Sequence, residues 1–229
     1  MELLTSLLPE TCFRTVFQLY HIQKYVQVNK SPHAIKDEHK IVSYSSKLDK
    51  ILLQISCKIQ VFVMPGKRDP VTHFIPQQPI HECFFPQSSK SDNFHLCTNP
   101  FKCQIDEYEI LGTDGQNVKS IYEYSRHKDT LESAEFCLAA NLIFPNAPEN
   151  IGTKNFGIGC YQFSEFDPLV IDNTPRLLFY GSSDRPISKI FDPHGTGEKF
   201  AIVGVPAFSE QLCAVKVNLD TLEVGELCV

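Results

Sequence analysis

The pattern of apolar positions along the chain first becomes regular between residues 45 and 56. Leucine and isoleucine recur there at positions i, i+3, i+4 and i+7, which places them along one face of an α-helix. Residues 59–64 first alternate apolar and polar side chains and then become continuously apolar, as in a buried strand, and they end at a Pro-Gly pair. The pattern predicts a helix, a strand and a glycine-containing loop, which together form an α/β unit.

Three short apolar runs follow a proline-rich stretch. They cover 94–97, 103–105 and 108–111 and are separated by the turn-forming pairs Asn-Pro and Asp-Glu. We expect three short strands in a meander.

Two further helices are expected between residues 117 and 143. Asn117 and Asp129 can act as N-caps, because their side chains can accept hydrogen bonds from the free backbone N–H groups of a first helical turn. The helices should cover 118–124 and 130–143, the second of which ends before a proline.

The rest of the chain has the pattern of a sheet. A strand is predicted over 176–180, ending at Gly181, and three more over 199–205, 212–217 and 222–227, joined by short turns. Strands with interspersed helices and an antiparallel tail predict an α/β sandwich.

The first 44 residues differ in character from the rest of the chain. Residues 11–28 carry aromatic and aliphatic side chains at helical spacing, and 31–40 are polar and include a proline. We interpret 1–44 as an uncertain leader, a weak helix plus a linker, and 45–229 as the folded part.

Composition and charge narrow the function classes. The 229 residues are 42% hydrophobic with 17 Phe, enough for a sizeable core, and 21 basic residues face 27 acidic ones. No basic run is longer than two residues, so we expect contact with DNA to be indirect. No segment approaches the ~20 apolar residues that a membrane span needs, and the start lacks a basic signal-peptide region.

The nine cysteines show neither a CxxC pair nor a regular spacing. We interpret them as reduced thiols of a nuclear or cytosolic protein. Cys57, Cys137 and Cys213 are expected to be buried apolar thiols. No histidine is tied to a cysteine or serine by a nucleophile motif, so no catalytic residue is predicted.

Two groups of residues have both a chemical and a structural interpretation. A metal cluster could be imagined from the set His73, His81, His95, Asp69 and Glu82, but the spacing favours surface or structural histidines. The stretch 76–79 (PQQP) is either a polyproline II ligand or, as we favour, a rigid loop packed against the sheet.

Glycines 112, 115 and 181 do not form a phosphate-binding loop, because no Lys-Ser/Thr follows them. Backbone turns with positive φ are expected at all three.

Four segments carry a family resemblance: 63–70 (VMPGKRDP), 76–81 (PQQPIH), 97–101 (CTNPF) and 111–117 (LGTDGQN). In order and spacing they resemble the signature segments of the B (small) subunits of replicative DNA polymerases, most closely those of the delta type. The resemblance runs from about residue 46 to the C-terminus. Its most specific signature positions are Gln77, Gln78, Pro79, Asn99, Pro100, Gly115, Gln116 and Asn117.

The resemblance implies a calcineurin-like metallophosphoesterase sandwich that has lost its metal centre and serves as a scaffold. The N-terminal OB domain and the first strands of that sandwich are not recognisable in residues 1–44. The implied protein is nuclear, needs no cofactor, and binds the C-terminal domain of the catalytic subunit of DNA polymerase delta and other accessory subunits.

The resemblance also identifies a degenerate phosphoesterase loop, made of Pro65, Gly66, Lys67, Arg68 and Asp69. Active enzymes of this fold carry Gly-Asn-His-Asp/Glu at the corresponding place, so Lys67 and Arg68 replace a metal ligand and a catalytic histidine. Two cations oppose binding of a dication, and only Asp69 could still act as a ligand. A later Gly-His-x-His is likewise replaced, by GSSD at 181–184.

Two alternatives remain at this point. The chain could be an active metallophosphoesterase or 3′-exonuclease, as the related archaeal small subunits are, although Lys67 and Arg68 argue against it. It could also be a truncated fragment without polymerase function that competes with a full-length subunit, which the missing upstream half favours.

Overall fold

The computed structural model describes residues 34–67, 69–147, 159–161, 163, 165–192 and 199–228. Most of the predicted leader lies outside these residues. The elements, in chain order, are α2 (Ala34–Ser56), β1 (Val61–Val63), the 3-10 helices η2 (Glu82–Phe84) and η3 (Ser88–Lys90), β2 (Phe94–Leu96), β3 (Phe101–Ile105), β4 (Tyr108–Thr113), α3 (Gln116–Tyr124), α4 (Thr130–Ala139), β5 (Leu177–Ser183), β6 (Ile187–Phe191), β7 (Phe200–Pro206), α5 (Phe208–Gln211), β8 (Cys213–Val217) and β9 (Val224–Cys228).

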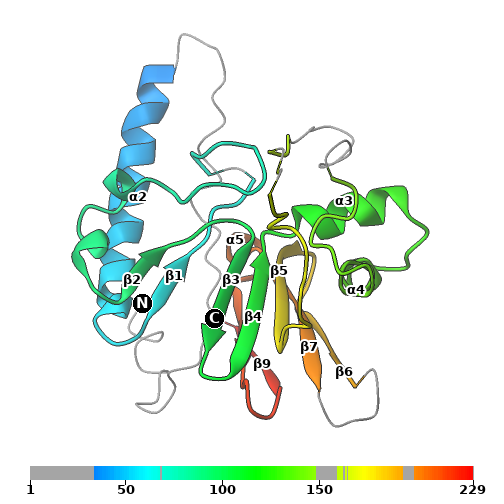
Figure 1. Cartoon of the computed structure of the whole chain (residues 1–229). Helices are drawn as coiled ribbons and strands as arrows, with labels where there is room; N and C mark the ends of the chain where they lie inside the picture. The colour runs from blue at the N-terminus through cyan, green and yellow to red at the C-terminus, as the bar shows by residue number, and fades with distance from the viewer. Residues whose placement is uncertain are drawn as a thin grey trace.

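A five-stranded mixed sheet forms the centre of the fold (Figure 1). Its strand order is β3-β4-β5-β7-β6. The three inner strands are parallel to one another, and both edge strands pair antiparallel with their neighbours. Parallel strands buried on both faces explain the continuous apolar runs in β5 and β7. The predicted α/β class is confirmed.

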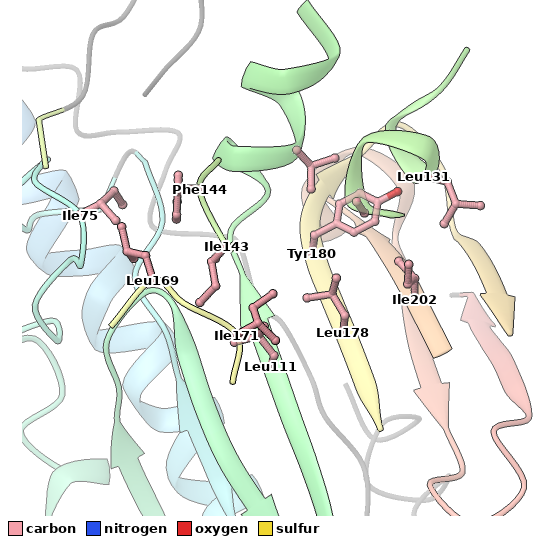
Figure 2. Packing of buried hydrophobic residues seen from close by; sticks show 12 residues of the cluster. Ile75, Leu111, Leu131, Ile143, Phe144, Leu169, Ile171, Leu178, Tyr180 and Ile202 are labelled. Atoms are coloured by element: carbon pink, nitrogen blue, oxygen red, sulfur yellow. The ribbon is translucent and has the colours of Figure 1, made fainter. Parts of the chain in front are cut away.

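Alternate residues of the inner strands contribute to two different cores, because successive side chains of a strand point to opposite faces. Leu111, Leu178, Tyr180 and Ile202 face helices α3 and α4 and pack there with Ile143 and other residues of the connecting segments. Figure 2 shows this cluster between the sheet and the helices.

The opposite face of the sheet is covered by the hairpin of β8 and β9. Phe179 and Val203 point to this side and pack against Val215 and Val217 of β8. Arg176, just before β5, binds the turn of this hairpin. Its guanidinium donates to the carbonyls of Leu219 (3.0 Å) and Asp220 (2.7 Å) in the turn, and to that of Lys199 (2.6 Å) just before β7. The guanidinium also lies over the ring of Tyr108, 4.9 Å from its centroid. The sheet is therefore the middle of three layers.

A smaller third cluster joins α2 to a separate two-stranded sheet. Leu52 of α2 packs there with Ile80, Phe85 and Phe94. The buried carboxylate of Asp49 accepts hydrogen bonds from the backbone N–H groups of Gln87 (3.0 Å) and Ser88 (2.8 Å), so the helix is also fixed to η3 by polar contacts. None of the helices that the structure describes has the length and apolar character needed to cross a bilayer.

The predicted meander is wrong in its pairing. β2 does not continue into β3 but pairs in parallel with β1, so that Val61 faces Phe94 and Val63 faces Leu96. Only β3 and β4 form an antiparallel hairpin. The apolar pattern identified the strands but carried no information on which strand each would join.

Several predicted boundaries change. Helix α2 begins at Ala34, eleven residues before the predicted start at 45, and α4 ends at Ala139 rather than at 143. Strand β5 continues through Gly181 to Ser183. Strand β6 was not predicted, because three of its five side chains are exposed and its apolar signal is weak.

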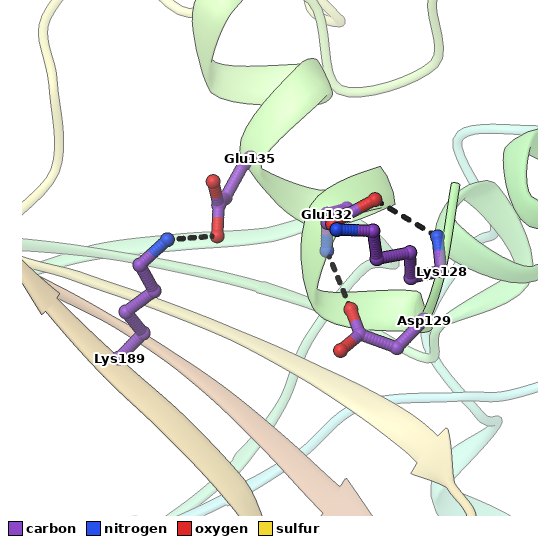
Figure 3. A network of polar contacts seen from close by, with 5 residues as sticks. All are labelled: Lys128, Asp129, Glu132, Glu135 and Lys189. Carbon is purple, nitrogen blue, oxygen red and sulfur yellow. Dashed lines mark hydrogen bonds and ion pairs between the residues drawn. The ribbon is translucent and has the colours of Figure 1, made fainter. Parts of the chain in front are cut away.

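The start of α4 agrees with the prediction at Asp129. Its carboxylate accepts from the backbone N–H of Glu132 at 2.9 Å, and the Glu132 carboxylate accepts from the N–H of Lys128 at 2.8 Å (Figure 3). These contacts satisfy N–H groups at the start of the helix. On the next turn Glu135 forms an ion pair of 2.8 Å with Lys189 of β6, which links the helix to the sheet edge.

The glycine prediction holds for one position of three. Gly115 has φ +88°, a left-handed conformation that favours glycine. Gly112 and Gly181 instead lie within strands. Gly112 is required by close packing, because a Cβ at this position would overlap the ring of Phe179.

Candidate functional site

Four segments that are distant in the sequence meet where β4 ends and α3 begins. They are the loop after β1, the proline-rich loop around Gln77, the turn at Asn99 before β3, and residues 113–117. Hydrogen bonds join all four. The degenerate loop and most of the signature positions expected from the sequence therefore belong to one buried polar cluster.

Gln77 and Asn99 form the link between two of these segments. Their backbones exchange a pair of hydrogen bonds, Gln77 N–H to Asn99 O at 2.7 Å and Asn99 N–H to Gln77 O at 3.1 Å. The side-chain amide of Asn99 also donates to the side-chain oxygen of Gln77 at 2.7 Å. Both residues are buried, with exposed fractions of 1% and 0%. A buried amide needs partners on both of its polar atoms. The Asn99 oxygen accepts from the backbone N–H of Asp114 at 3.4 Å, so this amide has partners on both atoms.

The amide nitrogen of Gln77 reaches the degenerate loop. It donates to the carbonyls of Thr72 at 3.2 Å and Gly66 at 3.4 Å. This contact settles the two interpretations of the PQQP stretch in favour of a loop packed in the protein, because a ligand segment would present its side chains outward.

Asp114, directly after β4, lies at the centre of the cluster and is 1% exposed. One carboxylate oxygen accepts from the backbone N–H of Lys67 at 3.0 Å and from the side-chain amide of Gln116. The other accepts from the backbone N–H of Gln116 at 3.2 Å. Burial raises the pKa of Asp114, and the hydrogen bonds from Asn99, Gln116 and Lys67 oppose that rise.

Asp69 is the second carboxylate of the cluster. Its Oδ2 accepts from the backbone N–H of Gly66 at 2.7 Å, which closes the loop on itself. Burial raises the pKa of Asp69 to about 6, partly offset by the Gly66 hydrogen bond, and the nearby Asp114 raises it further. Near neutral pH the site therefore holds a carboxylate that is close to accepting a proton.

Lys67 contributes to the cluster through its backbone N–H. Arg68, the other cation expected to oppose metal binding, lies outside the described residues. Pro65 and Gly66 are buried, whereas Gln78 is exposed and Pro79 and Pro100 are half-buried.

Asn117 is not the N-cap that the sequence predicted. Helix α3 begins one residue earlier, at Gln116, with Gly115 as its cap. Asn117 is buried within the first turn, where its oxygen accepts from the Thr113 hydroxyl at 3.0 Å and its amide donates to Ile143 O at 2.8 Å. Its side chain therefore joins α3 to the segment after α4. The Gln116 side-chain oxygen is buried without a hydrogen-bond partner.

The imagined metal cluster does not assemble. Among the described residues, a single group of three or more acidic, histidine or cysteine side chains has its ligand atoms within 4.8 Å of one another, and it consists of Cys213, Glu226 and Cys228. His73 and His81 are exposed on the proline-rich loop, and Glu82 is exposed at the start of η2. Asp69 and Asp114 accept hydrogen bonds from backbone N–H groups instead.

Of the three cysteines expected to be buried, Cys137 and Cys213 are buried, but Cys57 is exposed because it follows the last turn of α2. Burial raises the pKa of the Cys137 thiol to about 12.

Sequence reasoning did not assign a role to Asp114, the residue with the most connections in the cluster. The available signal was its position: it follows the apolar run of β4 immediately and precedes a glycine. A carboxylate at that point faces the free N–H groups at the start of α3.

The family model and the curated relatives agree on one family. The family model for the B subunit of DNA polymerase alpha/epsilon matches residues 20–189. The DNA polymerase delta small subunit of Arabidopsis thaliana is 34% identical over 200 residues, which cover 87% of this chain and 44% of the relative. DNA polymerase delta subunit 2 of Drosophila melanogaster is 31% identical over 178 residues, covering 78% of this chain and 39% of the relative.

The chain thus spans less than half the length of the curated relatives it matches. Among solved structures, one from work on a novel archaeal phosphodiesterase aligns with 94% of this chain and 100% of its own, at a TM-score of 0.42 and 8% identity.

Proposed function

Because this chain belongs to the family of DNA polymerase alpha/epsilon B subunits and is homologous to the small subunits of DNA polymerase delta, we propose that it is a non-catalytic accessory subunit of a DNA polymerase delta complex. The observation that supports the non-catalytic role is the buried Asp114, whose two oxygens are occupied by N–H donors from Lys67 and Gln116.

A two-metal phosphoesterase needs several hard oxygen or nitrogen ligands that are open to a cation and to an attacking water. In this cluster both oxygens of Asp114 accept from N–H groups of Lys67 and Gln116, and one oxygen of Asp69 accepts from the N–H of Gly66, so these donors compete with a cation for the carboxylates. Both Asp69 and Asp114 have raised pKa values, a sign that burial disfavours their charged form. The cluster fits a role in joining four segments of the fold.

We further propose which partners the chain binds and where it acts. The chain binds the C-terminal domain of the catalytic subunit of DNA polymerase delta and further accessory subunits, contacts DNA only through the complex, and acts in the nucleus. Its three layers are the C-terminal part, from residue 45 onward, of an inactive calcineurin-like sandwich. The net charge of −6 supports indirect contact with DNA.

The experiment is an affinity purification of the tagged full chain from its own cells, with mass spectrometry for the catalytic subunit of DNA polymerase delta. Extracts are treated with nuclease first, so that DNA cannot bridge two proteins. We expect recovery of the catalytic subunit at a level that does not change with nuclease. Recovery of a folded chain without it would contradict the proposal and favour a fragment without polymerase function.

A hydrolysis assay separates the proposal from the phosphoesterase alternative. The purified chain is incubated with a chromogenic phosphodiester and Mn²⁺ or Mg²⁺, alongside Asp114→Asn. We expect both to give the rate of the buffer. Metal-dependent hydrolysis that is lost in the variant would show an active site and overturn the non-catalytic assignment.

A further inference from the structure

Two cysteines face each other across the β8–β9 hairpin, which covers one face of the central sheet. Cys213, the first residue of β8, is the register partner of Cys228, the last residue of β9. Their Sγ atoms lie 2.7 Å apart, and both are free thiols. The carboxylate of Glu226 lies within 4.8 Å of both sulfur atoms.

We propose that Cys213 and Cys228 form a redox-active pair, a modification site at which a peroxide converts two thiols into a disulfide across the hairpin. The separation of the sulfur atoms is about 0.7 Å longer than a disulfide bond of about 2.05 Å, so the bond forms with a small movement. Register pairing already brings the two backbones together, and no element of the core has to move.

The same distance argues against a metal site. Two thiolates on a tetrahedral zinc ion, each about 2.3 Å from the metal, are separated by about 3.8 Å. The observed 2.7 Å is too short for that arrangement. The group also offers three side-chain ligands among the described residues, one fewer than a structural zinc site uses.

The two thiols differ in a way that fixes the order of steps. Cys228 is exposed and Cys213 is buried. Burial raises the pKa of the Cys213 thiol to about 11, and the neighbouring Cys228 contributes to the rise. Cys228 is therefore the sulfur that a dissolved oxidant reaches first, and Cys213 keeps its proton until the second step.

Hydrogen peroxide supplies the oxidising equivalents. The Cys228 thiolate attacks one peroxide oxygen, the O–O bond breaks, and the hydroxide released takes up the thiol proton as water, leaving a sulfenic acid. The Cys213 sulfur then attacks the sulfur of Cys228, the S–O bond of the sulfenic acid breaks, and the departing hydroxide takes the Cys213 proton and leaves as the second water. Two thiols and one peroxide thus yield a disulfide and two waters, and two glutathione thiols reverse the oxidation by exchange.

The sequence provides a direct assay for the bond. Trypsin cleaves after Lys199 and Lys216, so each cysteine of the pair falls in its own peptide, 200–216 or 217–229, and each peptide contains a single cysteine. The full chain is treated with dilute hydrogen peroxide, quenched with an alkylating agent, digested without reductant and analysed by mass spectrometry. We expect the two peptides to be recovered as one linked species that separates on reduction.

Cys228→Ser is the main variant, since its side chain is exposed and the substitution leaves the core intact. It should give no linked species and leave Cys213 as a thiol. Cys213→Ser should leave Cys228 as a sulfenic acid that reacts with dimedone. The exposed Cys57 and Cys83 serve as matched single thiols and should remain alkylatable at the same peroxide dose.

Three results would overturn the proposal. The first is oxidation of Cys228 in the wild type while Cys213 remains alkylatable, and the second is a disulfide between Cys228 and a cysteine other than Cys213. One equivalent of Zn²⁺ could protect both sulfur atoms from alkylation, which would identify a metal site instead. A wild-type chain that forms the linked species, together with a Cys228→Ser chain that does not, would support it.

Discussion

Replacing Asp69 by asparagine should stabilise the protein near neutral pH. The pKa of this carboxyl is raised from 3.8 to about 6 in the fold, mainly by burial. Above the folded pKa the native protein therefore holds a charge that the unfolded chain accommodates more easily. The difference corresponds to about 3 kcal/mol of the free energy of unfolding.

The direction of the pH dependence follows from proton counting. Between pH 3.8 and about 6 the native state keeps the Asp69 proton while the unfolded state has released it, so stability falls as the pH rises through this window. Asparagine resembles the protonated acid in shape and can still accept from the N–H of Gly66, but its amide group has to find a partner. We expect Asp69→Asn to be more stable than the wild type by about 2 to 3 kcal/mol near pH 8, with little difference near pH 3.5.

The assay is urea unfolding followed by far-UV circular dichroism, since the chain contains no tryptophan. Wild type and variant are compared at intervals from about pH 3.5 to about pH 8. Asp92→Asn, at an exposed position, is the matched control and should follow the wild-type curve.

Two results would refute the reasoning. Equal stability of wild type and Asp69→Asn across the range would show that burial does not disfavour the charge. A variant that is less stable at high pH would show that the charged carboxylate is used, for example by a cation. Stabilisation of the wild type alone by added Mn²⁺ would identify that cation and contradict the non-catalytic proposal as well.

Two other substitutions test how the layers are joined, both by urea unfolding. Gly115→Ala should lower the free energy of unfolding by about 2 to 4 kcal/mol, because φ is +88° and a Cβ would overlap the carbonyl oxygen of Gly181. The control Gly225→Ala, with open space around it, should change that free energy by less than about 0.5 kcal/mol. Equal effects of the two substitutions would contradict this prediction. Arg176→Lys should lower the free energy of unfolding by about 1 to 2 kcal/mol, since an ammonium cannot reproduce the planar guanidinium that donates to three carbonyls and lies over Tyr108. An unchanged unfolding midpoint would show that these guanidinium contacts do not stabilise the protein.

The sequence allowed most of the strands to be located, but it did not show how they pair. The apolar runs of β1 and β2 show that both are buried in part, yet pairing depends on contacts between segments about thirty residues apart, which periodicity does not encode. Strand β6 has an exposed middle and a short apolar signal, so it was missed.

The polar cluster at the end of β4 was also predicted only in part. The motif residues were identified from the sequence, but the hydrogen bonds that bring Gly66, Gln77 and Asn99 together were not predicted. Asn117 was assigned as a cap from its residue type alone, but the Gly115 backbone already begins the helix, which frees the Asn117 side chain to reach Ile143. Residue type predicts a local hydrogen bond more readily than a long-range one.

The division of the central sheet between two cores has a consequence for synthesis on the ribosome. Strands β5 and β7 are made before the hairpin that covers one of their faces, which lies between Cys213 and Cys228. While the hairpin residues pass through the exit tunnel, the hairpin does not yet cover Phe179 and Val203. At about 5 to 20 residues per second this interval lasts on the order of seconds, long enough for a chaperone or a partner protein to bind the exposed face before the hairpin closes it.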